Sequence, residues 1–241
     1  MASLFDMPQT LLVLPTYNEM ENIRPMVERL LDLETVIDVL VVDDNSPDGT
    51  SAEVLKLKKK YRFIKFKSKE KKLGIGSAHK YGIRYAVKNN FKILITMDAD
   101  GTHNPKYIKK ILTLIKKYDL ITTTRFSNKR SLKSWPLFRI LLTNLRHLII
   151  RFFLDINIDA SGAYRCYNLT KMKYKDILLA KDNGYSFFWE SVFILSKKKY
   201  SIGEIPIELP YRSSGSSKMK IGDIINALIY IFIISINKSK Y

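Results

Sequence analysis

Short apolar segments alternate with amphipathic segments along the first half of the chain. The apolar runs cover residues 10–14, 36–42, 63–66, 92–97 and 120–124, and their length and β-branched content predict buried strands. Apolar residues recur at helical spacing over residues 21–33, 51–61, 77–88 and 106–117. Strands that alternate with helices in this way predict an α/β fold: a mostly parallel, Rossmann-like sheet with helices on both faces.

Polar residues follow three of these predicted strands directly. The first strand runs into Pro-Thr-Tyr-Asn-Glu at residues 15–19, the second ends in Asp43 and Asp44, and the fourth leads to Asp98 and Asp100. Ligands of parallel α/β sheets bind outside the carboxyl ends of the strands. We therefore expect the three strand ends to form one site.

The acidic pair Asp98 and Asp100 suggests a metal ion. Carboxylates held close together repel one another unless a cation neutralises them, and carboxylate oxygens suit Mg²⁺ or Mn²⁺. Mg²⁺ often binds one or two carboxylates together with substrate phosphates. The alternative is a solvated turn in which Asp100, Thr102 or Asn104 caps the next helix.

Composition is consistent with one domain and an intracellular location. The chain has 241 residues, of which 46% are hydrophobic, enough for one sizeable core. A single cysteine, Cys166, excludes an intrachain disulfide and favours a reducing compartment. The first ten residues show neither a basic n-region nor an apolar h-region, so we expect no signal peptide and a cytoplasmic protein.

The charge favours an anionic partner. The formal net charge is +18, which suits a nucleic acid, a phosphorylated small molecule or an anionic membrane surface. The alternative is that many of the lysines are solvated surface residues without a partner role. A nucleic-acid binder would give no reason for acids at three strand ends. A phosphorylated ligand with a divalent cation explains both features, so we expect no nucleic-acid partner.

Several common active-site patterns are absent from the sequence. No G-x-G-x-x-G follows the first strand, and no P-loop sequence occurs. His79, His103 and His147 lie far apart without zinc-site spacing, and no Ser-His-Asp set is discernible. The glycines at 73–78, in Leu-Gly-Ile-Gly-Ser-Ala, are read as a tight turn before a helix.

Two helical segments have broad apolar faces. Near the C-terminus only residues 227–236 run without a strongly polar side chain, well short of the roughly 20 that span a bilayer. At helical spacing one apolar face there comprises Ile221, Ile224, Ile225, Leu228, Ile229, Phe232, Ile233 and Ile236. With Lys218, Lys220, Lys238 and Lys240 flanking it, this is the pattern of a membrane-interface helix. Residues 135–154 are a second candidate, and the alternative for both is packing against the sheet or a partner chain.

A set of motifs then occurs in a fixed order. It consists of LPTYNE, VVDDNSPDGT, KKLGIGSAHKYGI, MDADGTHNPKYI and TTTRF, followed by WPLFR, DASGAYRCY, GYSFFWE, IGEIPI and YRSSGSSKM. This set, over about residues 10 to 220, resembles the GT-A glycosyltransferases of family 2, and among them the dolichol-phosphate (polyprenyl-phosphate) mannose synthases.

The resemblance implies a role for specific residues. Pro15, Tyr17, Glu19, Val42 and Asp44 would bind the base and ribose of a nucleotide-sugar donor. At the donor diphosphate, Asp98, Ala99 and Asp100 would lie close, with Asp98 and Asp100 holding Mg²⁺ or Mn²⁺. The phosphates of donor or acceptor would contact Arg125, Arg212 and Lys218, and Arg139 or Arg212 would orient an acceptor phosphate.

The implied reaction is inverting transfer of mannose from GDP-mannose to a polyprenyl (dolichyl-type) phosphate, with Asp100, Arg125 and Arg212 as catalytic residues. Residues 1–220 would form the catalytic domain, and residues 221–241 a membrane-interface or docking helix. The enzyme would attach peripherally to the cytoplasmic face of a membrane, with a partner subunit as a possible anchor. Another family 2 donor, such as UDP-glucose, or a saccharide acceptor is the alternative.

Two residues need separate comment. Many relatives carry Leu-Gln-His or Leu-Ser-His after the acidic pair, whereas this chain has Gly101, Thr102 and His103. If that position supplies a metal ligand, Thr102 would do so through its hydroxyl. Glu190 lies in a predicted helix and could face the site, although an ordinary surface or supporting acid is the simpler interpretation.

Overall fold

The computed structural model describes residues 9–33, 35–128, 131–211 and 221–238. The strands are β1 (Thr10–Thr16), β2 (Asp38–Asp43), β3 (Ile64–Ser68), β4 (Ile93–Thr96), β5 (Leu120–Thr124), β6 (Arg165–Asn168) and β7 (Ile202–Pro206). The helices are α1 (Met20–Leu31), α2 (Thr50–Lys60), α3 (Ile75–Lys88), α4 (Ile108–Leu114), α5 (Leu137–Leu154), α6 (Tyr174–Ile177), α7 (Ser186–Lys197) and α8 (Ile221–Ile236), with a 3₁₀ turn, η2, at Pro105–Tyr107.

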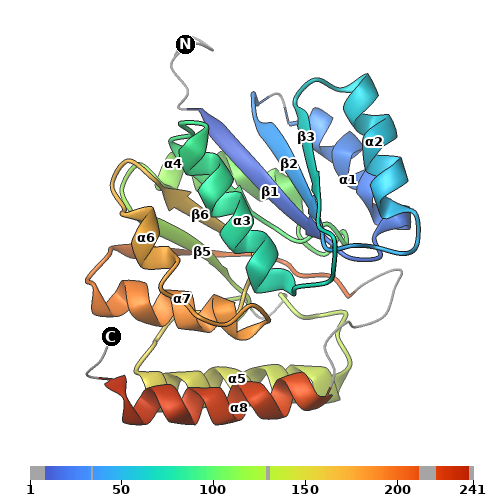
Figure 1. Ribbon diagram of the computed structural model, residues 1–241. Coiled ribbons are helices and arrows are strands. Elements are labelled where there is room, and N and C mark those ends of the chain that lie inside the picture. Colours follow the sequence, from blue (N-terminus) through green and yellow to red (C-terminus); the bar gives the residue numbers. More distant parts are fainter. Residues whose placement is uncertain (1–8, 34, 129–130, 212–220, 239–241) are drawn as a thin grey trace.

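The strands form one sheet in the order β3-β2-β1-β4-β6-β5-β7 (Figure 1). Neighbouring strands are parallel except at β6, which runs antiparallel to both β4 and β5. The carboxyl ends of β1, β2, β4 and β5 therefore meet one edge of the sheet, and the chain enters β6 at that same edge. This confirms the predicted fold and brings segments far apart in sequence together.

Each face of the sheet has its own hydrophobic core. On one face α1, α2 and α4 pack through residues such as Met26, Val54 and Ile108. On the other face α3 and α7 cover the sheet through Ile83 and Phe193. The strands are buried from both sides, which explains why their sequences are continuously apolar rather than alternating.

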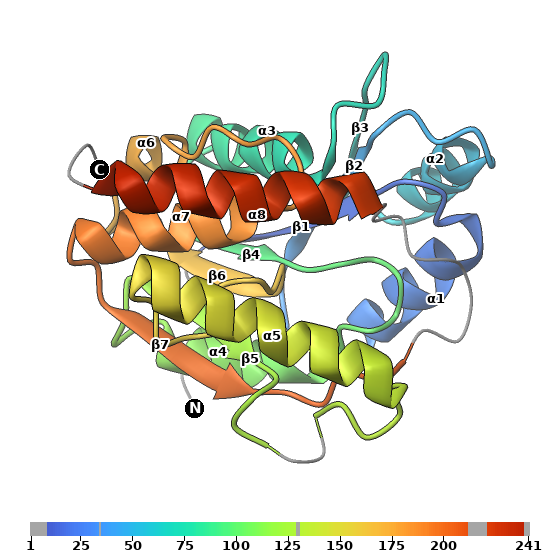
Figure 2. The same cartoon turned by 90° about the horizontal axis from the view of Figure 1, so that it is seen from below.

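Helices α5 and α8 lie side by side beyond α7 and form one surface of the molecule (Figures 1 and 2). Phe153 and Phe232 join them in an edge-on ring contact, with centroids 6.4 Å apart. In the part of the chain that the structure describes, no helix has both the length and the hydropathy that a membrane span requires.

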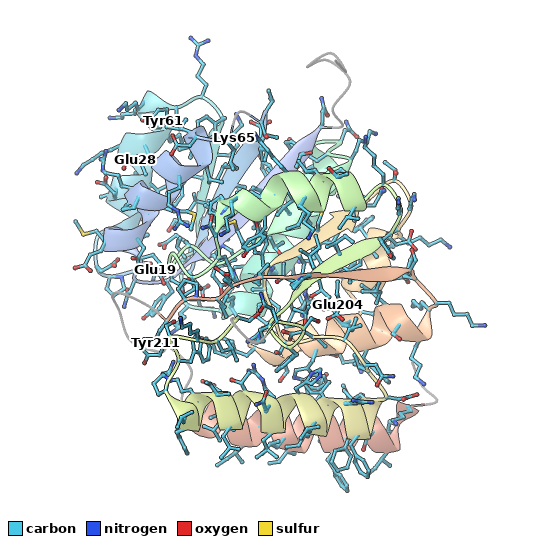
Figure 3. All side chains as sticks on the ribbon, turned by 180° about the vertical axis from the view of Figure 1, so that it is seen from behind. Glu19, Glu28, Tyr61, Lys65, Glu204 and Tyr211 are labelled. Atoms are coloured by element: carbon cyan, nitrogen blue, oxygen red, sulfur yellow. The ribbon has the colours of Figure 1, made fainter. Side chains whose placement is uncertain are left out.

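The apolar side chains of this surface point mostly away from the protein (Figure 3). On α5 the exposed ones are Leu137, Phe138, Leu141, Leu142, Leu145, Leu148 and Phe152. On α8 they are Ile224, Ile225, Leu228, Ile229, Phe232, Ile233 and Ile236. We call these two sets together the apolar platform. It contains the predicted apolar face of the C-terminal helix, apart from Ile221, whose side chain lies outside the described residues.

The side of α8 opposite the apolar platform packs in part on the protein, the alternative that the sequence left open, although Asn226 is exposed. Ile231 and Ile234 are buried against the domain, and the Tyr230 ring lies 5.4 Å from that of Trp189. The helix is therefore apolar around most of its circumference. A narrow side packs on the protein, and the broad side forms part of the apolar platform.

Other element boundaries differ modestly from the sequence prediction. The helix expected over residues 106–117 begins as η2 and continues as α4 only to Leu114. Pro105 favours such a tight first turn, and Asn104 caps it by accepting a hydrogen bond from the Lys106 N–H. β6 and β7 were not predicted. The four residues of β6 include buried polar side chains, and the five residues of β7 include a glycine and a proline, so neither segment gives a clear periodic signal.

Candidate active site

Strand register places the three predicted strand ends at one level. Pro15 pairs with Val42 across β1 and β2, while Val13 pairs with Thr96 across β1 and β4. Asp98, two residues beyond Thr96, therefore reaches the sheet edge near the level of Pro15. The structure thus brings the polar strand ends together, as the sequence predicted.

A short hydrogen-bonded turn holds the acidic pair. Asp100 is only 6% exposed, and its Oδ1 accepts hydrogen bonds from the backbone N–H and the hydroxyl of Thr102, at 3.1 and 2.7 Å. His103 Nδ1 accepts the backbone N–H of Asp98 at 2.9 Å. Gly101, with φ at 80°, makes the reversal that glycine permits without strain. Thr102 and His103 therefore orient the two carboxylates.

The acidic pair fits a magnesium or manganese ion that also binds substrate oxygens. Two carboxylates separated by one residue offer hard oxygen ligands, and Asp98 remains partly exposed. Among the described residues, no group of three or more His, Cys, Asp and Glu side chains could hold a metal. The two carboxylates of Asp98 and Asp100 suit a cation that takes its remaining ligands from phosphates and water.

The loop after β1 presents an aromatic ring and a buried acid. The ammonium of Lys72 lies 3.7 Å from the centre of the Tyr17 ring, a cation–π contact. Glu19 is buried, and its backbone N–H donates to the hydroxyl of Thr50. Its carboxylate accepts a hydrogen bond from the Asn22 side chain at 2.7 Å. This loop is therefore fixed at the edge of the sheet, with Tyr17 beside it.

The two acids after β2 have different surroundings. Asp43 is fully buried and accepts hydrogen bonds from the side chains of Thr16, Ser46 and Ser51. Its oxygens thereby hold the turn between β2 and α2. Asp43 is a structural residue.

Asp44 anchors the glycine-containing loop before α3. Its carboxylate pairs with the Lys69 ammonium at 3.0 Å and accepts the backbone N–H groups of Leu73 and Gly74. Gly74 has φ of 94°, and a Cβ there would lie 2.5 Å from the Asn183 carbonyl oxygen. Only glycine fits this position, so the loop is held by Asp44 on one side and packs closely on Asn183 on the other.

Arg125 follows β5 and is fixed by a buried carboxylate. Asp159 Oδ2 accepts hydrogen bonds from Arg125 Nε at 2.8 Å and from its backbone N–H at 3.3 Å. Burial raises the pKa of Asp159, but the charge and hydrogen bond of Arg125 outweigh it and hold that pKa below its usual value. A Cβ on Gly162 would lie 3.3 Å from Arg125 Nη2, so glycine leaves room for the guanidinium.

The remaining predicted residues have mixed outcomes. Val42 and Ala99 are buried, and their side chains lie in the hydrophobic core. Arg139 lies on α5 with its guanidinium 5.3 Å from the centre of the Tyr211 ring. Arg212 and Lys218 lie outside the described residues. Their assignments to donor or acceptor stay predictions.

Glu190 is a supporting acid, one of the two simpler interpretations of the sequence, and it does not lie at the surface. It is fully buried, and its carboxylate accepts hydrogen bonds from the backbone N–H groups of Lys181 and Asp182. It also accepts the Tyr230 hydroxyl at 2.7 Å. Glu190 therefore connects α7 with α8 and with the loop at 181–184.

Arg165 is a buried cation that the sequence did not identify. Its guanidinium donates to the carbonyl oxygens of Gly162, Ala160 and Phe188, and to the hydroxyl of Ser191. These contacts fix the segment between Asp159 and β6. Neither Asp159 nor Arg165 was predicted to be a site residue, although both lie in the motif DASGAYRCY.

The fold and the acidic sheet edge define a GT-A glycosyltransferase. Mannosyl-3-phosphoglycerate synthase from Rubrobacter xylanophilus superposes with a TM-score of 0.65 at 14% identity, over 96% of this chain and 74% of that one. A mannosyltransferase from Pyrobaculum calidifontis, solved in complex with GDP-Man and Mn²⁺, gives a TM-score of 0.56 at 12% identity, over 97% and 72%. At these identities the likeness concerns the fold.

Sequence comparison then gives the family. Residues 11–178 match glycosyl transferase family 2, and the chain belongs to that family. It is 30% identical to an undecaprenyl-phosphate mannosyltransferase from Micrococcus luteus, over 92% of both chains. It is also 30% identical to a polyprenol monophosphomannose synthase from Mycolicibacterium smegmatis, over 92% of this chain and 85% of the relative. The protein is therefore a glycosyltransferase.

Proposed function

We propose that this enzyme transfers mannose from GDP-mannose to a polyprenyl phosphate at a membrane surface. The observation that carries the proposal is a continuous connection between the sheet edge and the apolar platform. Arg125 pairs with Asp159, Asp159 accepts the Ser161 hydroxyl, and Ser161 accepts a hydrogen bond from Arg146 on α5. The proposed phosphate site and the helix proposed to face lipid would thus share one hydrogen-bond network, an arrangement that suits a phosphorylated lipid substrate.

The residues at the sheet edge suit the donor. Tyr17 and Glu19 would contact the nucleoside, and Asp44 would act there or through the loop that it anchors. Asp98 and Asp100 would hold Mg²⁺ or Mn²⁺, which when bound supplies positive charge to the leaving diphosphate. Arg125 supplies a fixed cation beside the same region, where negative charge develops in the transition state.

The acceptor would react without a general base. A phosphate monoester is already ionised near neutral pH, so one of its oxygens can attack the anomeric carbon directly. The new sugar–oxygen bond forms as the bond to the donor diphosphate breaks, and the electron pair leaves with the diphosphate. Attack from the opposite side inverts the anomeric carbon. Arg125 and Arg139 would hold the attacking phosphate in line.

The apolar platform and the net charge of +18 support peripheral membrane attachment. Phe138 is 69% exposed and Phe152 is 80% exposed, values that are unfavourable in water and suited to an acyl boundary. We place residues 1–220 as the catalytic domain and α8 as the docking helix. The anionic cytoplasmic leaflet would attract the basic surface around the platform. A membrane-anchoring partner subunit is the other possible occupant of the platform.

Donor binding tests the proposal directly. Purified protein is titrated with GDP-mannose with and without Mn²⁺, and in parallel with UDP-glucose. Asp100→Ala should abolish metal-dependent binding, whereas Asp32→Ala, which removes an exposed carboxylate at the end of α1, should leave binding intact. Preference for UDP-glucose would assign a different donor, and lack of binding by either sugar nucleotide would contradict the assignment of the acidic edge.

Acceptor and membrane use need their own assay. Transfer of labelled mannose to a detergent-dispersed isoprenyl phosphate should occur, and transfer to the corresponding alcohol should not. Flotation with vesicles containing anionic lipid should carry the full-length protein upward. Absence of binding to such vesicles would reject the membrane role and leave a partner subunit as the platform's occupant.

A further inference from the structure

Arg146 lies on the inward side of α5, away from the apolar platform. Thr143 and Ile150, which lie one helical turn to either side of it, are buried against the domain. Leu145 and Leu148, its neighbours on the outward side, are exposed. Arg146 therefore points from a lipid-facing helix toward the protein, at the boundary between the apolar platform and the active site.

The buried guanidinium of Arg146 has fewer hydrogen-bond acceptors than a buried charged group normally has. Its Nη2 donates to the Ser161 hydroxyl at 3.1 Å, a neutral acceptor. Its Nε is buried and has no hydrogen-bond partner among the described residues. Buried polar groups are normally satisfied, and an unsatisfied charged donor is costly. The geometry leaves a donor ready for an additional acceptor.

The nearby carboxylate does not fill this role. Both oxygens of Asp159 are already engaged, Oδ2 by Arg125 and Oδ1 by the N–H and hydroxyl of Ser161. Glu204 Oε1 accepts the Asp159 backbone N–H, and burial raises the pKa of Glu204. The guanidinium groups of Arg125 and Arg146 therefore lie near one carboxylate, that of Asp159, and both of its oxygens already accept hydrogen bonds.

Electrostatics agree with this geometry. Burial, followed by repulsion from Arg125, lowers the pKa of Arg146 to about 10. Asp159 opposes that shift only in part. Arg146 still carries its charge near neutral pH, so the protein holds two like charges close together without a second counterion. An anionic ligand between them would relieve the repulsion.

We propose that Arg146 is an acceptor-binding arginine in addition to Arg125 and Arg139, and that it binds the phosphate group of a phosphate monoester together with Arg125. This inference rests on the function proposed above and deepens it, because it explains selection of a monophosphate over an alcohol or a phosphodiester. Guanidinium groups bind phosphate oxygens through paired N–H donors. With Asp159 included, the three side chains carry a net charge of +1. They should therefore attract a dianionic monoester more strongly than a monoanionic diester, whereas an alcohol leaves the positive charge uncompensated.

The proposal predicts a selective effect on the acceptor. In Arg146→Gln, the KM for a short isoprenyl phosphate in non-ionic detergent should rise about 10- to 100-fold, the loss expected for charge-assisted hydrogen bonds. Binding of GDP-mannose should be unchanged. Arg146→Lys keeps the charge but loses the paired donors. Its acceptor KM should lie between the values of the wild type and of Arg146→Gln. Arg151→Gln removes an exposed arginine from the same helix and should leave the acceptor KM unchanged.

Ligand charge is the second arm of the test. Mannose transfer to one isoprenyl phosphate by the wild-type enzyme should be inhibited more strongly by a second isoprenyl phosphate of different length than by the monomethyl ester of that second compound. Arg146→Gln should reduce the difference between these two inhibition constants. Inorganic phosphate serves as a probe without a lipid tail. If it competes with the acceptor, the enzyme has a site that binds phosphate alone; if it does not compete, the lipid tail is also required for binding. An unchanged acceptor KM in Arg146→Gln, or donor and acceptor binding weakened together, would overturn the proposal.

The outcomes also separate this inference from the proposed function. If the wild type does not transfer mannose to isoprenyl phosphate, the proposed function fails, and equal binding of inorganic phosphate by wild type and Arg146→Gln would then reject the anion site too. If the wild type is active and the variant behaves identically, only this inference fails. Should Arg146→Gln not fold, Arg146→Lys gives the KM, and equal inhibition of the wild type by monoester and methyl ester overturns the proposal without any variant.

Discussion

Helices α7 and α8 have similar apolar sequences but opposite surroundings. Every residue of α7 from Ser186 to Leu195 is buried, and the helix fills the space between the sheet and α8. In α8 Ile231 and Ile234 are buried, but Phe232 is 55% exposed and Ile236 66%. The two helices contact each other through Trp189 and Tyr230. One apolar helix is thus part of the core, and its neighbour covers that core while offering a second apolar face.

The difference shows that apolar content alone does not distinguish a core helix from a docking helix. Both helices lack a clean alternation between apolar and charged sides. What separates them is position in the fold, because α7 has protein on all sides and α8 has it on one. Exposed apolar area of this extent marks a site of interaction with another apolar surface. The comparison can be tested by changing each helix in turn.

The largest effect is expected on membrane binding by α8. Replacing Ile225, Ile229 and Ile236 together with serine removes exposed apolar side chains, each worth up to about 1.5–3 kcal/mol when transferred from water. Binding to anionic vesicles should weaken by about 100-fold or more, while the free energy of unfolding stays near the wild-type value. Flotation and chemical denaturation measure the two. Asn226→Ser, an exposed polar change on the same helix, should alter neither.

In α7 a single substitution should produce the converse result. Phe193 is 1% exposed, so Phe193→Ala should lower the free energy of unfolding by about 3–5 kcal/mol through lost burial and a cavity. Denaturant titration measures this cost. Any variant that remains folded should bind vesicles as the wild type does. A loss of stability below 1 kcal/mol, on the order of a surface substitution, would show that α7 is not part of the core.

Acid should destabilise the contact between α3 and α7 through His79. This side chain is buried against Phe187 and Phe188, and burial lowers its pKa from 6.5 to about 3. Below pH 6.5 the unfolded chain takes up a proton that the folded protein does not, so stability falls as the pH falls. Between pH 6.5 and about 5 the loss should be about 2 kcal/mol. His79→Leu should flatten this part of the stability profile; an unchanged slope would contradict the assignment.

The smallest effect is expected at the contact between the two helices. Tyr230→Phe removes one hydrogen bond to the buried Glu190 carboxylate and should cost about 1.5 kcal/mol. The remaining bonds from Lys181 and Asp182 keep that carboxylate satisfied. Unfolding measurements give the cost. Hydrogen exchange should locate increased opening in α8 and not in α7; equal opening of both would mean that they behave as one unit.

Much of the fold could be predicted from the sequence because its elements are locally encoded. Residues 120–124 form the predicted strand, and α8 spans 221–236 as its pattern indicated. The antiparallel strand β6 could not be predicted, since four residues around the buried Arg165 depend on contacts across the sheet. The sequence predicted which residues form the exposed apolar face of α8. It did not show that Ile231 and Ile234, on another side of the helix, are buried against the protein.

The candidate site was predictable where residues follow strands. Asp98 and Asp100 come directly after β4, so their position follows from the rule for parallel sheets. The partnership of Arg125 with Asp159 was not predictable from spacing, because these residues are 34 positions apart and meet through a loop. His103 belonged to a recognised motif, yet its hydrogen bond to the Asp98 backbone emerges only from the geometry of the turn.

The buried guanidinium of Arg165 has a consequence for the energy of catalysis. By tying three carbonyl groups to one rigid cation, it sets the backbone around Asp159 during folding, and Asp159 in turn sets Arg125. The dipoles and charges that will meet a substrate are therefore oriented in advance. Solvent molecules would have to reorganise to provide the same field, whereas this preorganised arrangement makes that contribution before any substrate arrives.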